Sequence, residues 1–368
     1  DATHIIKIDL EDITNDYLRE PFTLIEHINQ RITDNKEYYI LIDEVQHLQR
    51  FEDVLNTLLK NSQIDVYVTG SNARFLSKDV ITTFRGRGDE VRIHPLSFEE
   101  YMSVQSPMPF AEQHLNDYMR LGGMPQLATM KNEEQKRQYL SNLFTNTYLL
   151  DIKERYAIKN DDDLEELIDV IASSIGCLTN PTKIANTFAS AKQSNISKDT
   201  IKKYLDYIQD AYMIEKAVRY DIKGRRYIDT PAKYYFEDLG LRNARINFRQ
   251  TEPTHLMENL IYNELRLRGY SVDVGQIVAN TRNANGVSER KYLEVDFVCN
   301  KADERIYIQS AYNMPTSEKQ EQELKSLKHI NDSFQKIIIV GGIQPTYRND
   351  DGILILNLYD FLLNKVTI

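Results

Sequence analysis

Tryptophan is absent from this chain of 368 residues, and only two cysteines occur, Cys177 and Cys299. Two cysteines so far apart encode neither a disulfide framework nor a zinc cluster, and they indicate a reducing compartment. No apolar run approaches the roughly 20 residues that a membrane helix needs, and no basic-then-apolar leader opens the sequence. We therefore expect a cytoplasmic protein that does not contact a membrane.

Glycine and proline are also sparse, with 14 and 10 residues, whereas 41% of the chain is hydrophobic and 27% is charged. This composition excludes fibrous and disordered proteins, and the length predicts two or three folded units. The net charge of -10 argues against a protein that coats nucleic acid indiscriminately. A local basic patch remains, because ten Lys and Arg residues accompany only five Asp and Glu residues between Pro181 and Arg226.

The first part of the sequence alternates between strands and helices. Continuous apolar runs suit parallel strands that are buried on both faces, and the intervening segments have helical spacing. We expect strands at 4–10, 38–42 and 64–69, helices at 21–32 and 51–59, and a further strand that begins at Val91-Arg92-Ile93. This alternation predicts an α/β fold with a parallel sheet.

Two carboxylates, Asp43 and Glu44, directly follow the apolar strand at 38–42. They are expected at the carboxyl edge of the sheet, where α/β proteins bind their ligands. One carboxylate can hold Mg²⁺ while the other polarises a water molecule for attack on a γ-phosphate. We assign Asp43 the metal role and Glu44 the role of the base.

Further polar residues follow at spacings that suit a nucleotide site. Ser71 and Asn72 come after the next strand, where they could orient the water or sense the γ-phosphate. Arg85 and Arg87 lie in a glycine-flanked loop, which suits charge neutralisation from a neighbouring subunit and predicts a homo-oligomer. Each piece alone is equally compatible with a solvated strand end or a surface turn, but their order and spacing together favour the nucleotide site.

Several of these motifs carry a family resemblance. They are Leu41–Gln46, Thr69–Asn72, Gly86-Arg87, Pro95–Tyr101, Arg120–Pro125 and Leu239–Asn243. In this order they resemble the bacterial and archaeal AAA-type P-loop ATPases that carry a C-terminal domain of unknown function. The resemblance spans the whole chain and implies ATP binding and hydrolysis, with Asp43 and Glu44 as the Walker B pair.

The sequence departs from that family in its phosphate-binding loop. Members carry a G-x-x-x-x-G-K-[ST] stretch upstream of the strand that corresponds to residues 4–10, and no such stretch occurs here. The loop supplies the backbone N–H groups and the lysine that hold the phosphates. We expect roughly 30–40 residues before Asp1 in the natural protein, which is the scale of one βα unit.

The remaining chain divides by its pattern into three parts. Residues 97–156 are helical, with a capped start at Ser97 and a break at Gly122–Pro125, which indicates a lid or connector after an ATPase core at 1–96. Three helices and a basic hairpin in residues 157–250 predict a winged helix-turn-helix. Residues 251–368 form the last predicted domain.

The winged-helix segment carries the local basic patch. Its third helix holds Lys198, Lys202 and Lys203, and its hairpin holds Lys223, Arg225 and Arg226. Recognition helices enter major grooves and basic wings contact phosphates, so these residues suit duplex DNA. The same segment is equally compatible with a packing module whose lysines are simply solvated.

The predicted element order of the last domain is αβββαβ, with Glu258 on the helix and Asp296 on a strand. This arrangement resembles the PD-(D/E)xK, restriction-endonuclease-like fold, in which an Asp and a following Glu-x-Lys bind Mg²⁺ and activate water. Gln309 and Ala311 stand at the Glu and Lys positions, so cleavage should fail.

Two alternatives remain for this degenerate nuclease-like site. A lysine from the later helix, Lys325 or Lys328, could replace the missing one. Otherwise Glu294 and Asp296 simply face solvent at alternate strand positions.

These patterns lead to one main functional expectation. The protein is an ATP- and Mg²⁺-dependent switch or motor, an ATP phosphohydrolase that couples nucleotide state to a C-terminal module for duplex DNA or a protein partner. The alternatives are a non-catalytic binding scaffold and an ATP-gated DNA endonuclease.

Overall fold

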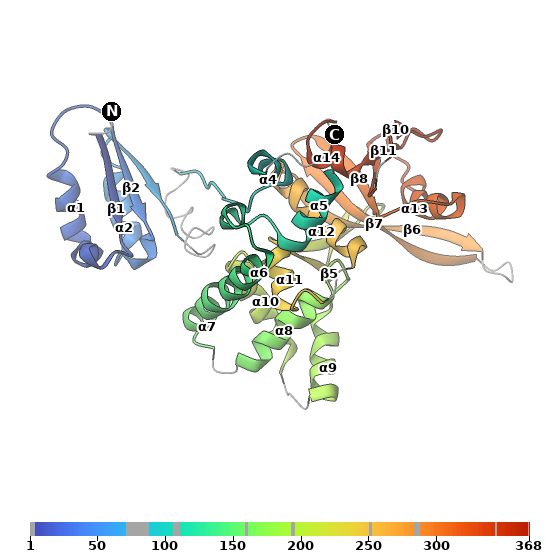
Figure 1. Cartoon of the computed structure of the whole chain (residues 1–368), viewed down its shortest axis with the longest axis horizontal. Coiled ribbons are helices and arrows are strands. Elements are labelled where there is room, and N and C mark those ends of the chain that lie inside the picture. The colour runs from blue at the N-terminus through green and yellow to red at the C-terminus, as the bar shows by residue number, and fades with distance from the viewer. Residues whose placement is uncertain are drawn as a thin grey trace. The chain divides into compact units, whose positions relative to one another are not determined.

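A computed structural model describes residues 4–70, 88–105, 111–158, 161–192, 196–249, 252–282, 288–342, 344–366 and 368 (Figure 1). The chain divides into two compact units. The N-terminal unit comprises residues 1–92 with 210–212, and the C-terminal unit comprises residues 93–209 and 213–368. None of the described helices combines the length and the apolar character needed to span a membrane.

The N-terminal unit contains a parallel sheet of order β1-β2-β3. Its elements are β1 (Ile5–Asp9), the 3-10 helix η2 (Ile13–Arg19), α1 (Pro21–Asn29), β2 (Tyr38–Asp43), the 3-10 helix η3 (Val45–His47), α2 (Phe51–Leu58) and β3 (Ile64–Val68). The register pairs Ile8 with Ile42 and Ile42 with Val68. The strands and helices expected between residues 4 and 69 are therefore confirmed.

The spacing of apolar residues in the sequence explains which side chains form the core of the N-terminal unit. Alternate residues of β2, Tyr38, Ile40 and Ile42, are buried. Helix α2 buries Phe51, Val54, Leu55 and Leu58, which is the i, i+3, i+4, i+7 stripe of an amphipathic helix. These side chains share one core with β1 and α1.

The prediction of a strand that begins at Val91-Arg92-Ile93 is wrong. These residues belong to no strand among the described residues, and the side chains of Val91 and Ile93 are 81% and 87% exposed. Two β-branched residues satisfy strand propensity, but burial against neighbouring strands decides whether a strand forms. This segment lacks that burial.

The first half of the C-terminal unit is helical. Its elements are α4 (Phe98–Val104), α5 (Ala111–Leu121), the 3-10 helix η4 (Pro125–Thr129), α6 (Glu133–Leu143), the π-helix η5 (Phe144–Leu149), α7 (Leu150–Arg155), α8 (Asp161–Ser173), α9 (Pro181–Lys192), α10 (Lys198–Asp210) and, after a hairpin, α11 (Leu239–Arg245). The capped start at Ser97 is confirmed, because Ser97 and Glu100 form a reciprocal capping box.

An eight-stranded sheet of order β10-β11-β9-β8-β7-β6-β4-β5 organises the second half. Its elements are β4 (Ile214–Asp221), β5 (Arg226–Phe236), α12 (Pro253–Leu267), β6 (Ser271–Arg282), β7 (Ser288–Lys301), β8 (Glu304–Ala311), α13 (Ser317–Lys328), β9 (Gln335–Val340), β10 (Tyr347–Arg348), β11 (Leu354–Asn357) and α14 (Leu358–Leu362). The predicted order αβββαβ is present from α12 to β9.

The basic hairpin predicted as a wing is the β4–β5 hairpin. Its strand β4 pairs in parallel with β6, with Arg219 opposite Val274 and Asp221 opposite Gln276. The hairpin is therefore part of the same sheet as the strands of the predicted last domain.

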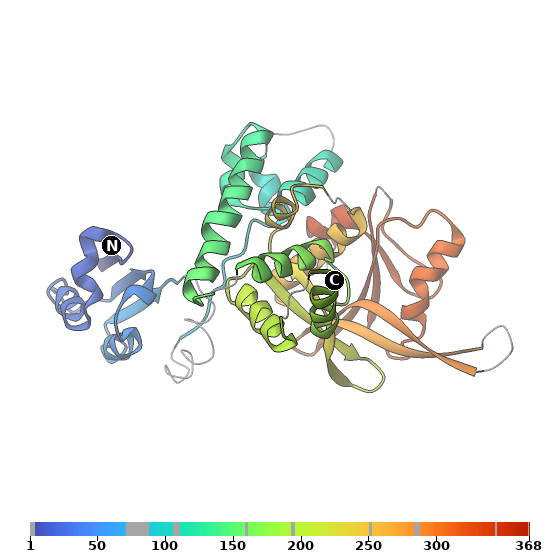
Figure 2. The ribbon, with the colours of Figure 1, turned by 90° about the horizontal axis from the view of Figure 1, so that it is seen from below.

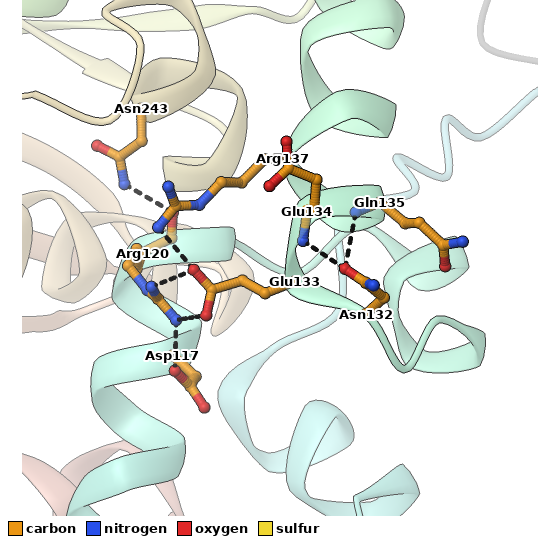
Figure 3. A network of polar contacts seen from close by, with 8 residues as sticks. All are labelled: Asp117, Arg120, Asn132, Glu133, Glu134, Gln135, Arg137 and Asn243. Atoms are coloured by element: carbon orange, nitrogen blue, oxygen red, sulfur yellow. Dashed lines mark hydrogen bonds and ion pairs between the residues drawn. The ribbon is translucent and has the colours of Figure 1, made fainter.

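A polar network joins α5, α6 and α11 (Figure 3). The guanidinium of Arg120 donates to both oxygens of Glu133, at 2.6 and 3.0 Å, and to Asp117 at 3.0 Å. Arg137 donates to the same Glu133 at 2.6 Å. The side-chain amide of Asn243 donates to the Arg120 carbonyl at 2.9 Å, which ties α11 to the end of α5.

Glycines allow α5 and α11 to approach closely. The N–H groups of Gly123 and Leu241 donate to the buried carboxylate of Asp238, at 2.7 and 2.9 Å. A Cβ at Gly240 would lie only 2.0 Å from the carbonyl oxygen of Leu121. The separated motifs at 120–125 and 239–243 thus form one contact.

Candidate functional site

The carboxylates Asp43 and Glu44 lie where β2 ends. Asp43 is the last residue of β2 and pairs with Asp9 at the end of β1, so both strands finish at the same edge of the sheet. Glu44 has a φ of 52°, a left-handed conformation that turns the chain sharply away from the strand. Asp43 is exposed and Glu44 is half-buried.

Thr69, at the end of β3, holds this turn from the neighbouring strand. Its hydroxyl accepts a hydrogen bond from the Glu44 N–H at 3.1 Å and donates to Oδ1 of Asp43. Its backbone carbonyl accepts from the Val45 N–H at 3.0 Å. The side chain of Gln46 donates to Oε2 of Glu44. In the sequence this threonine belongs to the motif Thr69–Asn72. Its contacts with Asp43 and Glu44 arise from the parallel pairing of β2 with β3, which the sequence alone does not give.

This edge fits part of a nucleotide site. An exposed carboxylate beside a second one supplies the oxygen ligands that Mg²⁺ prefers. Ser71, Asn72, Arg85 and Arg87 lie outside the described residues, so their roles stay predictions.

A second group of ionisable side chains lies in the C-terminal unit, and we call it the carboxylate–lysine cluster: Lys233, Glu258, Glu294 and Asp296. The ammonium of Lys233 lies 2.8 Å from Glu258, 2.7 Å from Glu294 and 4.0 Å from Asp296. The Lys233 side chain is only 3% exposed, whereas Glu294 is 39% exposed. Glu294 therefore forms the solvent-facing rim of the cluster.

Strand β5 and helix α12 bring the cluster together. Lys233 and Tyr235 are two residues apart, so they point to the same face of β5, and both donate to Oε1 of Glu258. The neighbouring Asn259 donates to and accepts from the backbone of Phe236, each at 2.8 Å, which fixes α12 against the strand.

Asp296 is held from the adjacent strand β8. Its Oδ2 accepts a hydrogen bond from the Ser310 N–H at 2.8 Å. Gln309, the residue at the position of the nuclease Glu, accepts from the Asp296 N–H at 3.4 Å. The structure thus brings the carboxylates of Glu258 and Asp296 to the same ammonium, whereas the Gln309 side chain contacts the backbone of Asp296 and the hydroxyl of Ser326 on α13.

Burial and charge act against each other in this cluster. Burial alone would lower the pKa of Lys233, but Glu258, Asp296 and Glu294 outweigh it and hold the pKa above its usual value. Burial raises the pKa of Asp296, and the nearby Glu258 raises it further, against the opposing effect of Lys233. One ammonium cannot neutralise three carboxylates, so Asp296 takes up a proton more readily than an exposed carboxylate.

The cluster corrects two interpretations made from the sequence. Lys328 does not serve it, because its ammonium contacts Glu321 and Asp351 at 3.1 and 2.9 Å. Asp296 does not face solvent, because it is only 7% exposed. Among the described residues, no group of three His, Cys, Asp or Glu side chains is arranged to hold a metal ion.

Lys233 and the inward contact of Glu294 were missed by sequence reasoning. The available signal was a single lysine in the apolar run Ala232-Lys233-Tyr234-Tyr235-Phe236. A charged residue that is buried in such a run needs an ionic partner. The sequence alone does not identify that partner.

The predicted DNA-contacting residues are all on the surface. They are Lys198, Lys202 and Lys203 on α10, and Lys223, Arg225 and Arg226 on the β4–β5 hairpin. Arg226 contacts Asp221 at 3.4 Å while its side chain stays 75% exposed. This exposure fits both the DNA-binding alternative and the solvated one.

Two family profiles match the chain. An AAA domain matches residues 1–102, and a domain of unknown function (DUF8612) matches residues 112–252. The first match includes Asp43, Glu44 and Thr69, and the second includes α5 to α11.

Two uncharacterized proteins and one crystal structure match this chain. An uncharacterized protein of Haemophilus influenzae is 33% identical over 366 residues, which covers 98% of this chain and 87% of that protein. An uncharacterized protein of Methanocaldococcus jannaschii is 27% identical over 297 residues, covering 78% of this chain and 64% of that protein. A crystal structure of a Vibrio cholerae protein matches 99% of this chain and 97% of its own, but at 12% identity and a TM-score of 0.24. The chain belongs to the same family as the Haemophilus influenzae protein, with an AAA domain at its N-terminus.

Proposed function

We propose that this protein binds and hydrolyses ATP, and that it acts as a switch or motor that couples nucleotide state to its C-terminal module. The supporting observation is the pair Asp43 and Glu44 at the carboxyl edge of a parallel sheet, clamped by Thr69. The match of residues 1–102 to an AAA domain supports the same function.

In this proposal the polar residues of the site have separate roles in ATP hydrolysis. Asp43 would hold Mg²⁺, and Glu44 would orient and deprotonate the attacking water. Ser71 and Asn72 would sense the γ-phosphate, and Arg85 and Arg87 would act on the site of a neighbouring subunit.

ATP hydrolysis tests this proposal directly. The natural, full-length protein should hydrolyse ATP only with Mg²⁺, and Glu44→Gln should bind ATP but lose turnover. The matched control is Asp65→Asn, which changes an exposed carboxylate on β3 and should leave turnover intact. Full activity of Glu44→Gln would contradict the assigned base, and no thermal shift with Mg-ATP would favour a scaffold.

For the C-terminal module we propose a winged helix and a nuclease-like fold that bind nucleic acid without cutting it. The support is the element order from α12 to β9 and the ammonium of Lys233, which forms ion pairs with Glu258 and Glu294. The wild-type protein should leave plasmid DNA intact in Mg²⁺. Cutting by the wild type that disappears in Asp296→Ala would establish the endonuclease alternative instead.

A further inference from the structure

Two β-hairpins project from the eight-stranded sheet in the same direction. Strands β4 and β6 run parallel, with Asp221 opposite Gln276, and each strand then continues to the tip of its own hairpin. The β4–β5 hairpin and the long β6–β7 ribbon extend side by side from this pairing (Figure 2). The basic turn at Lys223–Arg225 follows Asp221 at the same spacing as residues 278–280 follow Gln276.

The strand register assigns side chains to one face of these hairpins. Directly paired residues point to the same side of a sheet, so Arg226, Asp221, Gln276 and Glu294 form a row across β5, β4, β6 and β7. The contact between Arg226 and Asp221 agrees with this assignment. This face is the one that carries the rim of the carboxylate–lysine cluster.

Further residues continue the row outward along β7. Side chains alternate between faces, so Tyr292 and Arg290 lie on the same face as Glu294. The Tyr292 side chain is 63% exposed, and Arg290 is exposed as well. We define Arg226, Arg290, Tyr292 and Glu294 as the ribbon face.

The opposite face of the same hairpins is buried in a hydrophobic core. Tyr220, Ile222, Ile277 and Val295 belong to it and are packed into the core beneath α13. The exposed tyrosine of the ribbon face thus does not belong to that core. An exposed aromatic ring on the same face as two arginines has the composition of a base-stacking platform.

We propose that the ribbon face binds single-stranded nucleic acid, with one base stacked on Tyr292 and phosphates held by Arg290, Arg226 and the turn at Lys223–Arg225. Stacking needs the open face of a base, which a duplex does not offer. The carboxylates of the cluster repel phosphate and define the inner end of this track. The proposal rests on the nucleic-acid role of the C-terminal module and specifies its ligand and location.

Fluorescence anisotropy with a labelled oligo-dT of about 20 nucleotides, longer than a single binding site, tests the proposal on the full chain. Tyr292→Ala should weaken binding about 5- to 100-fold, and Tyr292→Phe should restore it because the ring is kept. Arg290→Gln should also weaken binding and reduce the salt dependence by about one phosphate contact. Tyr347→Ala is the matched control, since Tyr347 is an exposed tyrosine on β10 at the far edge of the sheet.

Three binding results would contradict the ribbon face as the binding site, and they can be told apart from a failure of the proposed ATPase function. Binding by the wild type that is insensitive to Tyr292→Ala, but lost on replacing Lys202 and Lys203, would overturn the ribbon face and favour α10. Tighter binding to a duplex of the same length would overturn it as well. No binding of either form at low salt would remove the nucleic-acid role altogether, whereas ATP hydrolysis would be unaffected.

Discussion

The ammonium of Lys233 lies 2.8 Å from Oε1 of Glu258, although one residue is on β5 and the other on α12. Glu294, on β7, approaches the same ammonium at 2.7 Å. A single buried cation therefore links three elements of the C-terminal unit. Because the ammonium and two of its partners, Glu258 and Asp296, are buried, this interaction differs from the solvated ion pairs elsewhere on the same hairpin.

Lys233→Met should strongly destabilise the protein, because it leaves several carboxylates buried without a counter-ion. The expected loss is about 3–5 kcal/mol in urea unfolding at neutral pH.

Lys216→Met is the control for this change. Lys216 pairs with Asp229 on the same hairpin, but Asp229 is 72% exposed. An exposed pair contributes only about 0–1 kcal/mol. Equal losses in the two variants would show that the Lys233 contacts are no stronger than a surface ion pair.

Asp238 should make stability depend on pH. Burial raises the pKa of this carboxyl from 3.8 to about 6, against the opposing N–H groups of Gly123, Leu241 and Gly240. The folded state then binds the proton more readily than the unfolded state. The resulting stabilisation is fully present below about pH 4 and is lost as the pH rises through about 6.

The measurement compares the wild type with Asp238→Asn between pH 4 and 8. A shift of this size corresponds to about 3 kcal/mol, so the wild type should lose roughly that much relative to the variant over this range. A difference between the two proteins that stays constant from pH 4 to 8 would contradict a raised pKa.

Gly240→Ala should destabilise the C-terminal unit even though alanine favours helices. Its Cβ would lie 2.0 Å from the Leu121 carbonyl, so α5 and α11 would have to separate. Overpacking of this kind costs about 1–3 kcal/mol, measured by thermal or urea unfolding. Gly88→Ala is the control because, among the residues that the structure describes, no atom lies within 4 Å of the new Cβ, and it should be neutral.

The sequence was most informative where function and folding depend on local pattern. Asp43 and Glu44 could be placed at a sheet edge because a buried strand precedes them directly. Lys233 could not be assigned to the cluster because its partners are 25 to 63 residues away and are brought near by sheet and helix packing. The ribbon face could not be predicted from the sequence for the same reason, because it depends on the parallel pairing of β4 with β6.

Thr69 offers the last test, because it contacts the carboxylate of Asp43 and the backbone N–H of Glu44 in the proposed ATP site. Thr69→Val keeps the shape of the side chain but removes the hydroxyl that accepts from the Glu44 N–H and donates to Asp43. Loss of such a supporting hydrogen bond typically lowers metal affinity or activity about 10- to 100-fold. ATP turnover and its Mg²⁺ dependence should both weaken, whereas Thr69→Ser retains the hydroxyl and should stay close to the wild type. Equal activity of the valine and serine variants would mean that the threonine does not position the carboxylates.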